Sequence, residues 1–243
     1  MPERINKFLS RAGICSRRQA EQLILEKRIK VNGVQIETPI IFVDSQSLIE
    51  VDGVVVKQAE ATRIWRYYKP VGYLTTHHDP QGRLTVFEDL KAYDLPRVVS
   101  VGRLDLNSEG LLLLTNDGEF SRFAELPKTG WQRCYRVRVF GSLNSSALLK
   151  LKQGITIEGV HYAPIKVEID DPSKKGWNHW LRVTLQEGKN REIRKVMNHL
   201  NLQVSRLIRE AYGPFCLGDL TPHGLAEIPF WDVKKHWPLK GQG

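Results

Sequence analysis

The hydrophobic and polar positions of the first sixty residues predict two short helices followed by β-hairpins. An i, i+3, i+4, i+7 repeat of apolar residues predicts a first helix over residues 5–12, ended by a glycine. Ser16 opens a capping box that begins a second helix. Asn-Gly at 32–33 and Asp-Gly at 52–53 lie between short apolar runs, which is typical of hairpin turns.

From residue 65 the pattern changes to a long series of short strands with few helices. Strands are predicted over 65–68, 98–101, 111–115, 133–140, 162–169, 180–185 and 204–209, with another near Ile155. Helices are predicted over 85–90, 119–126, 145–151 and 187–200. The pattern predicts an α+β fold: a small N-terminal helix-hairpin domain, then a mixed, largely antiparallel β-sheet with flanking helices. We place the domains at 1–60 and 65–243, with 61–64 as the linker.

Composition indicates a protein with a real core and an acidic partner. The 243 residues are 41% hydrophobic and carry a formal net charge of +9, with an isoelectric point near 9.5. This charge favours nucleic acid as the partner. Three well-separated cysteines match no zinc spacing and fit reduced thiols. With no apolar run near the roughly 20 residues of a membrane span and no signal-peptide pattern, we expect a cytoplasmic protein that binds no membrane.

The positive charge is concentrated at the N-terminus. Residues 1–36 hold eight Lys or Arg against three Glu. Such a run is often only the solvated face of a helix. Here it gathers around the second helix and the following turn, as expected of cations that bind RNA phosphates. The RNA-binding candidates are Arg4, Lys7, Arg11, Arg17, Arg18, Arg28 and Lys30.

The most informative stretch is the loop between the two apolar strands predicted at 98–101 and 111–115. This loop holds Arg103 and Asp105, with leucines on either side of the aspartate. A loop clamped by buried strands presents its side chains at fixed places. An isolated aspartate in such a loop is more often a turn cap than a functional group.

Two further segments carry candidate chemistry. Strict alternation over 133–140 places Tyr135 on the inner face of a strand, where a tyrosine usually packs with its hydroxyl hydrogen-bonded. The segment 187–195 opens a helix with four basic residues, which could contact phosphate only. The run His77-His78-Asp79 has no matching ligand pair elsewhere, so we predict no metal site.

The central stretch resembles the core motif of pseudouridine synthases, in the branch that modifies ribosomal RNA. It reads Gly-Arg-Leu-Asp at 102–105 and Gly-Leu-Leu-Leu-Leu-Thr-Asn-Asp-Gly at 110–118. One departure is Glu109, where the pattern has a small Ser or Thr. The N-terminal segment resembles a small RNA-binding domain found in a ribosomal small-subunit protein and in tyrosyl-tRNA synthetases. That likeness is carried by Ser-Arg-Ala-Gly at 10–13, Ser-Arg-Arg at 16–18 and Val-Asn-Gly at 31–33.

The resemblance implies a role for each candidate residue. Asp105 would be the nucleophile, Tyr135 would lie against the target base, and Arg194 would pair with Asp105. The substrate-binding residues would be Arg103, which fills the space of the flipped base, the aliphatic Leu207, and the basic pair Lys189 and Arg191. The reaction implied is isomerisation of a specific uridine in ribosomal RNA, most like the large-subunit enzymes. No cofactor is needed, the partner is ribosomal RNA or a pre-ribosomal particle, and we expect a monomer.

Two other functions fit parts of the sequence. A non-catalytic RNA-binding protein of ribosome assembly would keep the basic patches and have no need for Asp105, Tyr135 and Arg194 together. An RNA N-glycosylase would share the carboxylate and release a free base. Nucleotide mapping of RNA from a deletion strain separates the three.

Overall fold

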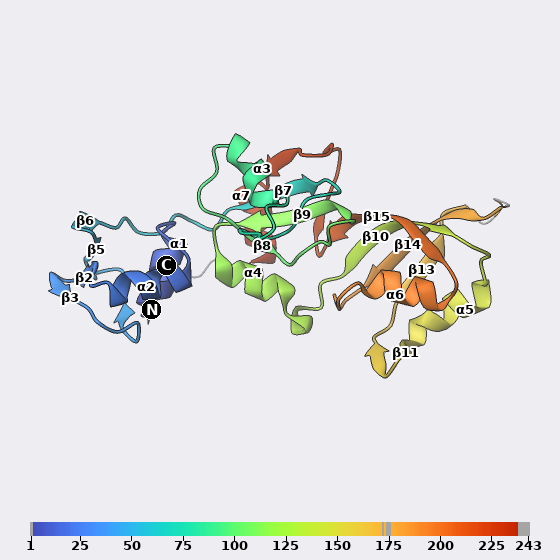
Figure 1. Ribbon diagram of the computed structural model, residues 1–243, viewed down its shortest axis with the longest axis horizontal. Helices are drawn as coiled ribbons and strands as arrows, with labels where there is room; N and C mark the ends of the chain where they lie inside the picture. Colours follow the sequence, from blue (N-terminus) through green and yellow to red (C-terminus); the bar gives the residue numbers. More distant parts are fainter. Residues whose placement is uncertain (1, 172, 174–175, 238–243) are drawn as a thin grey trace. The chain divides into compact units, whose positions relative to one another are not determined.

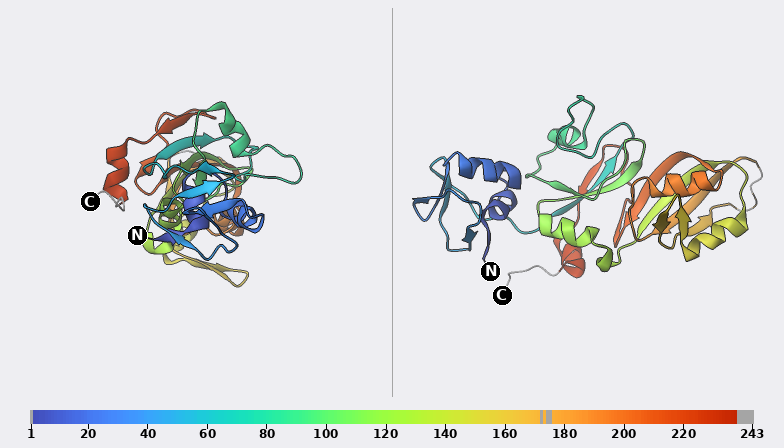
Figure 2. Two further views of the ribbon diagram at one scale, coloured as in Figure 1. Left: turned by 90° about the vertical axis from the view of Figure 1, so that its left-hand side faces the viewer. Right: turned by 60° about the horizontal axis from the view of Figure 1, so that its bottom comes forward.

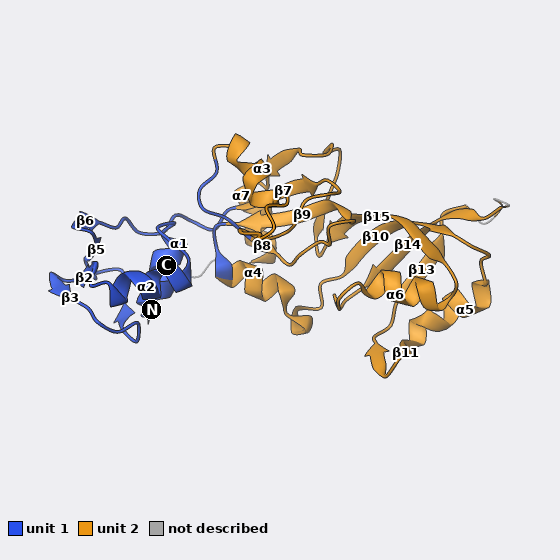
Figure 3. Ribbon diagram, viewed as in Figure 1, with its two compact units in different colours: residues 1–63, 95–99, 116–118 blue, residues 64–94, 100–115, 119–243 orange. Residues whose placement is uncertain are grey.

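The chain is described by a computed structural model that covers residues 2–171, 173 and 176–237. It forms two compact units (Figure 3). Unit 1 comprises residues 1–63, 95–99 and 116–118, and unit 2 comprises the remaining residues. The chain first passes from unit 1 to unit 2 between Arg63 and Ile64, and it returns to unit 1 at 95–99 and at 116–118.

Unit 1 packs two helices and short strands around an apolar core. Its elements are β1 (Glu3–Arg4), α1 (Ile5–Arg11), α2 (Arg17–Leu25), β2 (Ile29–Val31), β3 (Val34–Gln35), β4 (Phe42–Val43), β5 (Ile49–Val51) and β6 (Val54–Val55). Both sides of the predicted capping box are present, because Ser16 and Gln19 each accept the other's backbone N–H. Both predicted hairpins are confirmed, and they join into one sheet of order β3-β2-β5-β6.

Unit 2 is built on one mixed sheet, confirming the predicted fold class. The sheet path runs β13-β14-β10-β15-β9-β7-β17, with β16 beside β15 and β8 beside β9. Its strands are β7 (Ile64–Lys69), β8 (Val99–Val101), β9 (Glu109–Thr115), β10 (Arg133–Phe140), β13 (Lys166–Ile169), β14 (Asn178–Leu185), β15 (Gln203–Tyr212), β16 (Phe215–Cys216) and β17 (Leu225–Glu227). Along the path the pairs are antiparallel except β9 with β15, which is parallel.

Helices and a separate hairpin accompany this sheet. They are α3 (Val86–Asp89), α4 (Gly118–Glu125), α5 (Ser145–Lys150), α6 (Glu192–His199) and α7 (Phe230–His236), with the hairpin β11 (Ile155–Ile157) and β12 (Val160–Tyr162). Helix α6 lies against strand β15 and helix α5 against strand β13 (Figures 1 and 2). On β10 the alternation is as predicted, with Tyr135, Val137 and Val139 buried. No described helix is long and apolar enough to span a bilayer.

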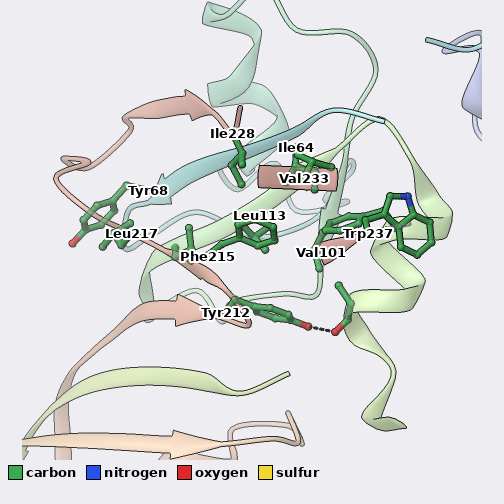
Figure 4. Packing of buried hydrophobic residues seen from close by; sticks show 13 residues of the cluster. Ile64, Tyr68, Val101, Leu113, Tyr212, Phe215, Leu217, Ile228, Val233 and Trp237 are labelled. Carbon is green, nitrogen blue, oxygen red and sulfur yellow. Dashed lines mark hydrogen bonds between the residues drawn. The ribbon is translucent and has the colours of Figure 1, made fainter. Parts of the chain in front are cut away.

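One apolar core of unit 2 lies against strands β7 and β9. Leu111 and Leu113 of β9 pack there with Phe120 of α4 (cluster in Figure 4). Trp237, at the end of α7, belongs to the same cluster and is tilted against Phe123 at 4.9 Å between ring centroids. The C-terminal segment, to which the sequence assigned no role, therefore completes the core.

Three predicted boundaries are wrong. The strand predicted over 162–169 is interrupted between β12 and β13, where Pro164 has no N–H to give to a sheet. The helix predicted from residue 187 begins only at Glu192, because Arg191 has a left-handed backbone with φ of 53°. The helix predicted over 119–126 begins one residue earlier, at Gly118, and ends at Glu125.

Candidate active site

The loop that carries Asp105 is held on both sides by hydrogen bonds of its own backbone. The Asp105 carbonyl accepts the N–H of Ser108 at 3.0 Å, closing a turn, and the Leu106 carbonyl accepts the N–H of Gly72 at 2.9 Å. The hydroxyl of Thr75 donates to the Leu104 carbonyl at 3.0 Å. The loop is thus fixed between β8 and β9, while the Asp105 side chain keeps 35% of its surface exposed.

Two buried basic side chains, Lys69 and Arg209, donate hydrogen bonds to backbone carbonyls of the loop. Lys69, at the end of β7, is fully buried and donates from Nζ to the carbonyls of Ser108 at 2.7 Å and Pro70 at 2.9 Å. Burial lowers the pKa of Lys69 to about 8. Arg209 of β15 is only 2% exposed and donates to the carbonyls of Leu111 at 2.7 Å and Arg103 at 3.4 Å. Both side chains therefore use their charge to hold backbone oxygens beside Asp105.

Arg194 does not form the direct pair with Asp105 that the resemblance implied. Its guanidinium donates to the carbonyls of Asn107 at 2.6 Å and Val204 at 3.1 Å, bridging the loop and β15. Burial lowers its pKa, and the nearby positive charge of Arg191 acts in the same direction. The cation within ion-pair distance of Asp105 is instead Arg191, with 3.8 Å between Nη1 and Oδ2. The Asp105 carboxylate itself is partly exposed.

Tyr135 and Leu207 lie on adjacent strands and both are buried. Leu207 is paired with Val137 and Tyr135 with Arg209, so the two side chains share the inner face of the β10–β15 pair. Arg209 reaches from this strand to the loop. The structure therefore brings strand β10, strand β15 and the Asp105 loop into one region.

The other predicted substrate-binding residues differ in their surroundings. Arg103 is exposed, and its side chain has no partner among the described residues. Lys189 is already engaged, because its Nζ donates to the His161 carbonyl and to Glu187 and lies 5.7 Å from the centre of the Tyr162 ring.

Comparison with known proteins decides the family. The model of the RNA pseudouridylate synthase family matches residues 63–199, and that of the S4 domain matches residues 3–39. The chain belongs to the RNA pseudouridylate synthase family. A Rickettsia felis protein named an uncharacterized RNA pseudouridine synthase is 48% identical over 93% of this chain and 96% of its own length. The enzyme is therefore an RNA pseudouridine synthase with an N-terminal S4 domain.

More distant relatives agree with this assignment. The ribosomal large subunit pseudouridine synthase B of Pasteurella multocida is 42% identical over 91% of this enzyme, which spans 65% of that protein. A crystal structure of a pseudouridylate synthase superposes with a TM-score of 0.67 at 23% identity, covering 96% of this enzyme and 99% of that chain. At that identity it shows a common fold.

The predicted RNA-binding residues of unit 1, which contains the S4 domain and is called the S4 unit below, fall into two groups. Lys7 and Arg11 pair with Glu3, and Arg28 pairs with Asp52 and Glu26. The rest are exposed and have no acidic partner in the part of the chain that the structure describes: Arg4, Arg17, Arg18 and Lys30.

Sequence reasoning missed the synthase's buried polar residues. Lys69 ends a buried strand beside a proline, which is a detectable signal because a lysine in an apolar run must find partners. Glu109 and Arg209 carry no such local signal, since their partners lie 97 and 98 residues away in the chain. Within the described ranges, no group of three or more His, Cys, Asp or Glu side chains could hold a metal ion.

Proposed function

We propose that this pseudouridine synthase isomerises a uridine of large-subunit ribosomal RNA, with Asp105 as the nucleophile. The observation that carries the proposal is the fixed loop around Asp105. Lys69, Arg194 and Arg209 hold three of its backbone carbonyls, while the carboxylate stays accessible. The large-subunit substrate is supported by relatives such as the Pasteurella multocida enzyme.

The chemistry moves uracil from a nitrogen–carbon to a carbon–carbon glycosidic bond. Attack of the Asp105 carboxylate on the sugar's anomeric carbon breaks the bond to N1 and leaves the uracil with the electron pair. The uracil turns so that C5 faces the sugar, the new C5 bond forms, and the carboxylate is released. The C5 proton must then leave, and N1 takes up a proton, so the isomerisation is balanced without a cofactor.

For the remaining site residues we propose the roles that the family resemblance implies. The target uridine must leave its stack to reach Asp105. Arg103 is exposed, two residues before the nucleophile, and is placed to fill the vacated space. Tyr135 lies against the base and takes the C5 proton, directly or through water. Leu207 supplies an apolar surface on the neighbouring strand.

The test uses RNA labelled with tritium at C5 of uridine. Pseudouridine formation replaces the C5–H bond and releases tritium to water, whereas an N-glycosylase releases a base that keeps the label. A protein that only binds RNA releases neither. We expect tritium release from large-subunit transcripts and none from small-subunit transcripts. Release of labelled free uracil, or release only from small-subunit RNA, would overturn the proposal.

A further inference from the structure

Glu109, the residue at which the central motif departs from the family pattern, is buried in a charged cluster. Its carboxylate accepts from Nε and Nη2 of Arg206 at 2.7 and 3.0 Å, and from the Tyr68 hydroxyl at 2.8 Å. Only 7% of Glu109 is exposed. Since Tyr68 is on β7, Glu109 begins β9 and Arg206 is on β15, one carboxylate joins three neighbouring strands.

The cluster lies where the two halves of the unit 2 sheet meet. The parallel pairing of β9 with β15 consists of Ile208 with Glu109 and Arg209 with Gly110. Most antiparallel neighbours in the sheet path pair over longer stretches, such as the eight residue pairs of β10 with β14. The junction is therefore short, and the Glu109–Arg206 ion pair adds a side-chain link across it.

The two sides of this junction carry different parts of the proposed site. The β9 side carries the loop with Asp105, which ends immediately before Glu109. The β15 side carries Leu207, next to Arg206, and pairs with the strand that holds Tyr135. The distance between the nucleophile and the surfaces that contact the base thus depends on how firmly β9 and β15 are joined.

The backbones at the junction are also unusually close. At Gly110, whose φ is 99°, an added Cβ would lie 2.4 Å from the Arg209 carbonyl oxygen. A close approach of two backbones tolerates little displacement, because packed interiors resist small changes of position. The Glu109–Arg206 ion pair, by holding β9 against β15, therefore also holds the two parts of the proposed site at a constant distance.

The electrostatics keep the link formed. Hydrogen bonding and charge from Arg206 lower the pKa of Glu109, and burial raises the pKa of the Tyr68 phenol to about 12. A buried carboxylate with a two-pronged arginine and a phenol donor has its oxygens satisfied. Removal of one partner leaves a buried charge uncompensated.

We propose that Glu109 is a positioning residue for the reaction: with Arg206 and Tyr68 it fixes the junction between the half of the sheet that carries Asp105 and the half that carries Tyr135 and Leu207. This inference rests on the proposed function, because it acts through residues assigned there.

The test compares Glu109→Gln with wild type in the full-length protein. We expect the single-turnover rate at saturating RNA to fall by roughly 10- to 100-fold, as for small misplacements of reacting groups. RNA affinity should stay within about threefold, because Glu109 faces the interior. Glu109→Asp keeps the charge with a shorter reach and should recover part of the rate. Glu109→Gln with wild-type rate and intact fold would overturn the proposal.

Two further variants separate positioning from folding. Asp170→Asn is the matched control, since it removes another carboxylate–arginine contact of the sheet, to Arg136 at 3.2 Å, away from the junction. It should keep the wild-type rate, and an equal loss in both variants would contradict the inference. Tyr68→Phe removes only the hydroxyl that donates to Glu109. It tests the positioning role if Glu109→Gln does not fold. A severalfold lower rate at unchanged melting temperature supports the inference, and an unchanged rate overturns it. Absence of pseudouridine with the wild-type enzyme would instead overturn the proposed function.

Discussion

Basic side chains are used in opposite ways in the two units. In the S4 unit, Arg17 and Arg18 lie at the surface, and the described chain offers them no acidic partner. Around Asp105, Lys69 and Arg209 are buried and their donors are directed at backbone carbonyls. Exposed cations attract RNA phosphates with little demand on geometry, whereas buried cations must be paired and therefore fix the chain around them. We therefore expect the basic residues of the first unit to contribute RNA affinity and those of the second to fix the geometry of the site.

The largest effect is expected when Asp105, the proposed nucleophile, is neutralised. Asp105→Asn should lower the single-turnover rate by roughly 10⁴-fold or more, as for nucleophiles in other enzymes. Affinity for RNA should stay within a few-fold, because only one partly exposed carboxylate changes. Rates come from quenched single-turnover assays, and affinity from filter binding. A wild-type rate in the purified variant would remove Asp105 from its role.

Arg194 tests whether a half-buried cation that binds backbone carbonyls fixes the geometry of the site. Arg194→Ala frees the carbonyls of Asn107 and Val204, and we expect a loss of roughly 100-fold in rate at saturating RNA. Arg194→Lys keeps the charge without the two-pronged contact and should retain part of the rate. Because Arg194 is only half-buried and its bond to the Asn107 carbonyl is exposed, the loss of stability should be small. A near-normal rate with weakened binding would make Arg194 a phosphate contact.

Arg191 provides the comparison for Arg194. Its contact to Asp105 is long, at 3.8 Å, and its side chain is 47% exposed. Exposed ion pairs contribute roughly 0.2–1 kcal/mol, so Arg191→Ala should reduce the rate by only a few-fold. Both variants are measured in the same assay. If Arg191→Ala lost more rate than Arg194→Ala, Arg191 and not Arg194 would be the arginine that matters more for the geometry of the site.

The S4 unit should respond in affinity alone. The double variant Arg17→Ala with Arg18→Ala should weaken RNA binding. It should also reduce the slope of log affinity against log salt by roughly 0.7–0.9 for each phosphate that the variant no longer neutralises. The rate at saturating RNA should not change. Arg28→Ala is the matched control, because Arg28 is already paired with Asp52 and Glu26. An unchanged salt slope would contradict a phosphate-binding role.

The smallest effect concerns Glu192, at the start of α6. Burial and the neighbouring Glu187 carboxylate raise the pKa of Glu192 to about 7. When the pKa of a carboxyl group is higher in the folded than in the unfolded state, ionisation of that group lowers the free energy of unfolding. This loss develops as the pH rises from the pKa of the unfolded state through the pKa of the folded state, here about 7. Between pH 5 and 8, Glu192→Gln should therefore gain roughly 1–2 kcal/mol over wild type. Urea unfolding at several pH values checks this. If the free energy of unfolding depended on pH in the same way for both proteins, the prediction would be contradicted.

The features that could be predicted are those set by residues close together in the chain. The alternation over β10 and the capping box at Ser16 follow from spacings of two and three residues. The motif around Asp105 could likewise be recognised because its residues, 102–105 and 110–118, are close together in the chain. The break at Pro164 could have been predicted too, since a proline gives no N–H to a sheet, yet the apolar run around it concealed the interruption.

The partners of buried charges could not be predicted in this way. Glu109 appeared as a departure from a pattern, and its meaning depends on Arg206, 97 residues further along. Arg194 was assigned to Asp105, whereas its hydrogen bonds go to the carbonyls of Asn107 and Val204. Backbone carbonyls are present at every residue, so no sequence pattern distinguishes the ones that a buried cation will reach.

The sequence alone determined the two-part α+β architecture, the nucleophile candidate and the strand faces, because hydrophobic periodicity and turn chemistry act over a few residues. The tertiary structure alone decided which cation lies beside Asp105, which carbonyls Lys69, Arg194 and Arg209 hold, and how Glu109 joins β7, β9 and β15. The buried charges among these residues are Lys69, Glu109 and Arg209, on β7, β9 and β15. Burial forces such charges to find partners across the fold, and only the assembled sheet brings those partners within reach.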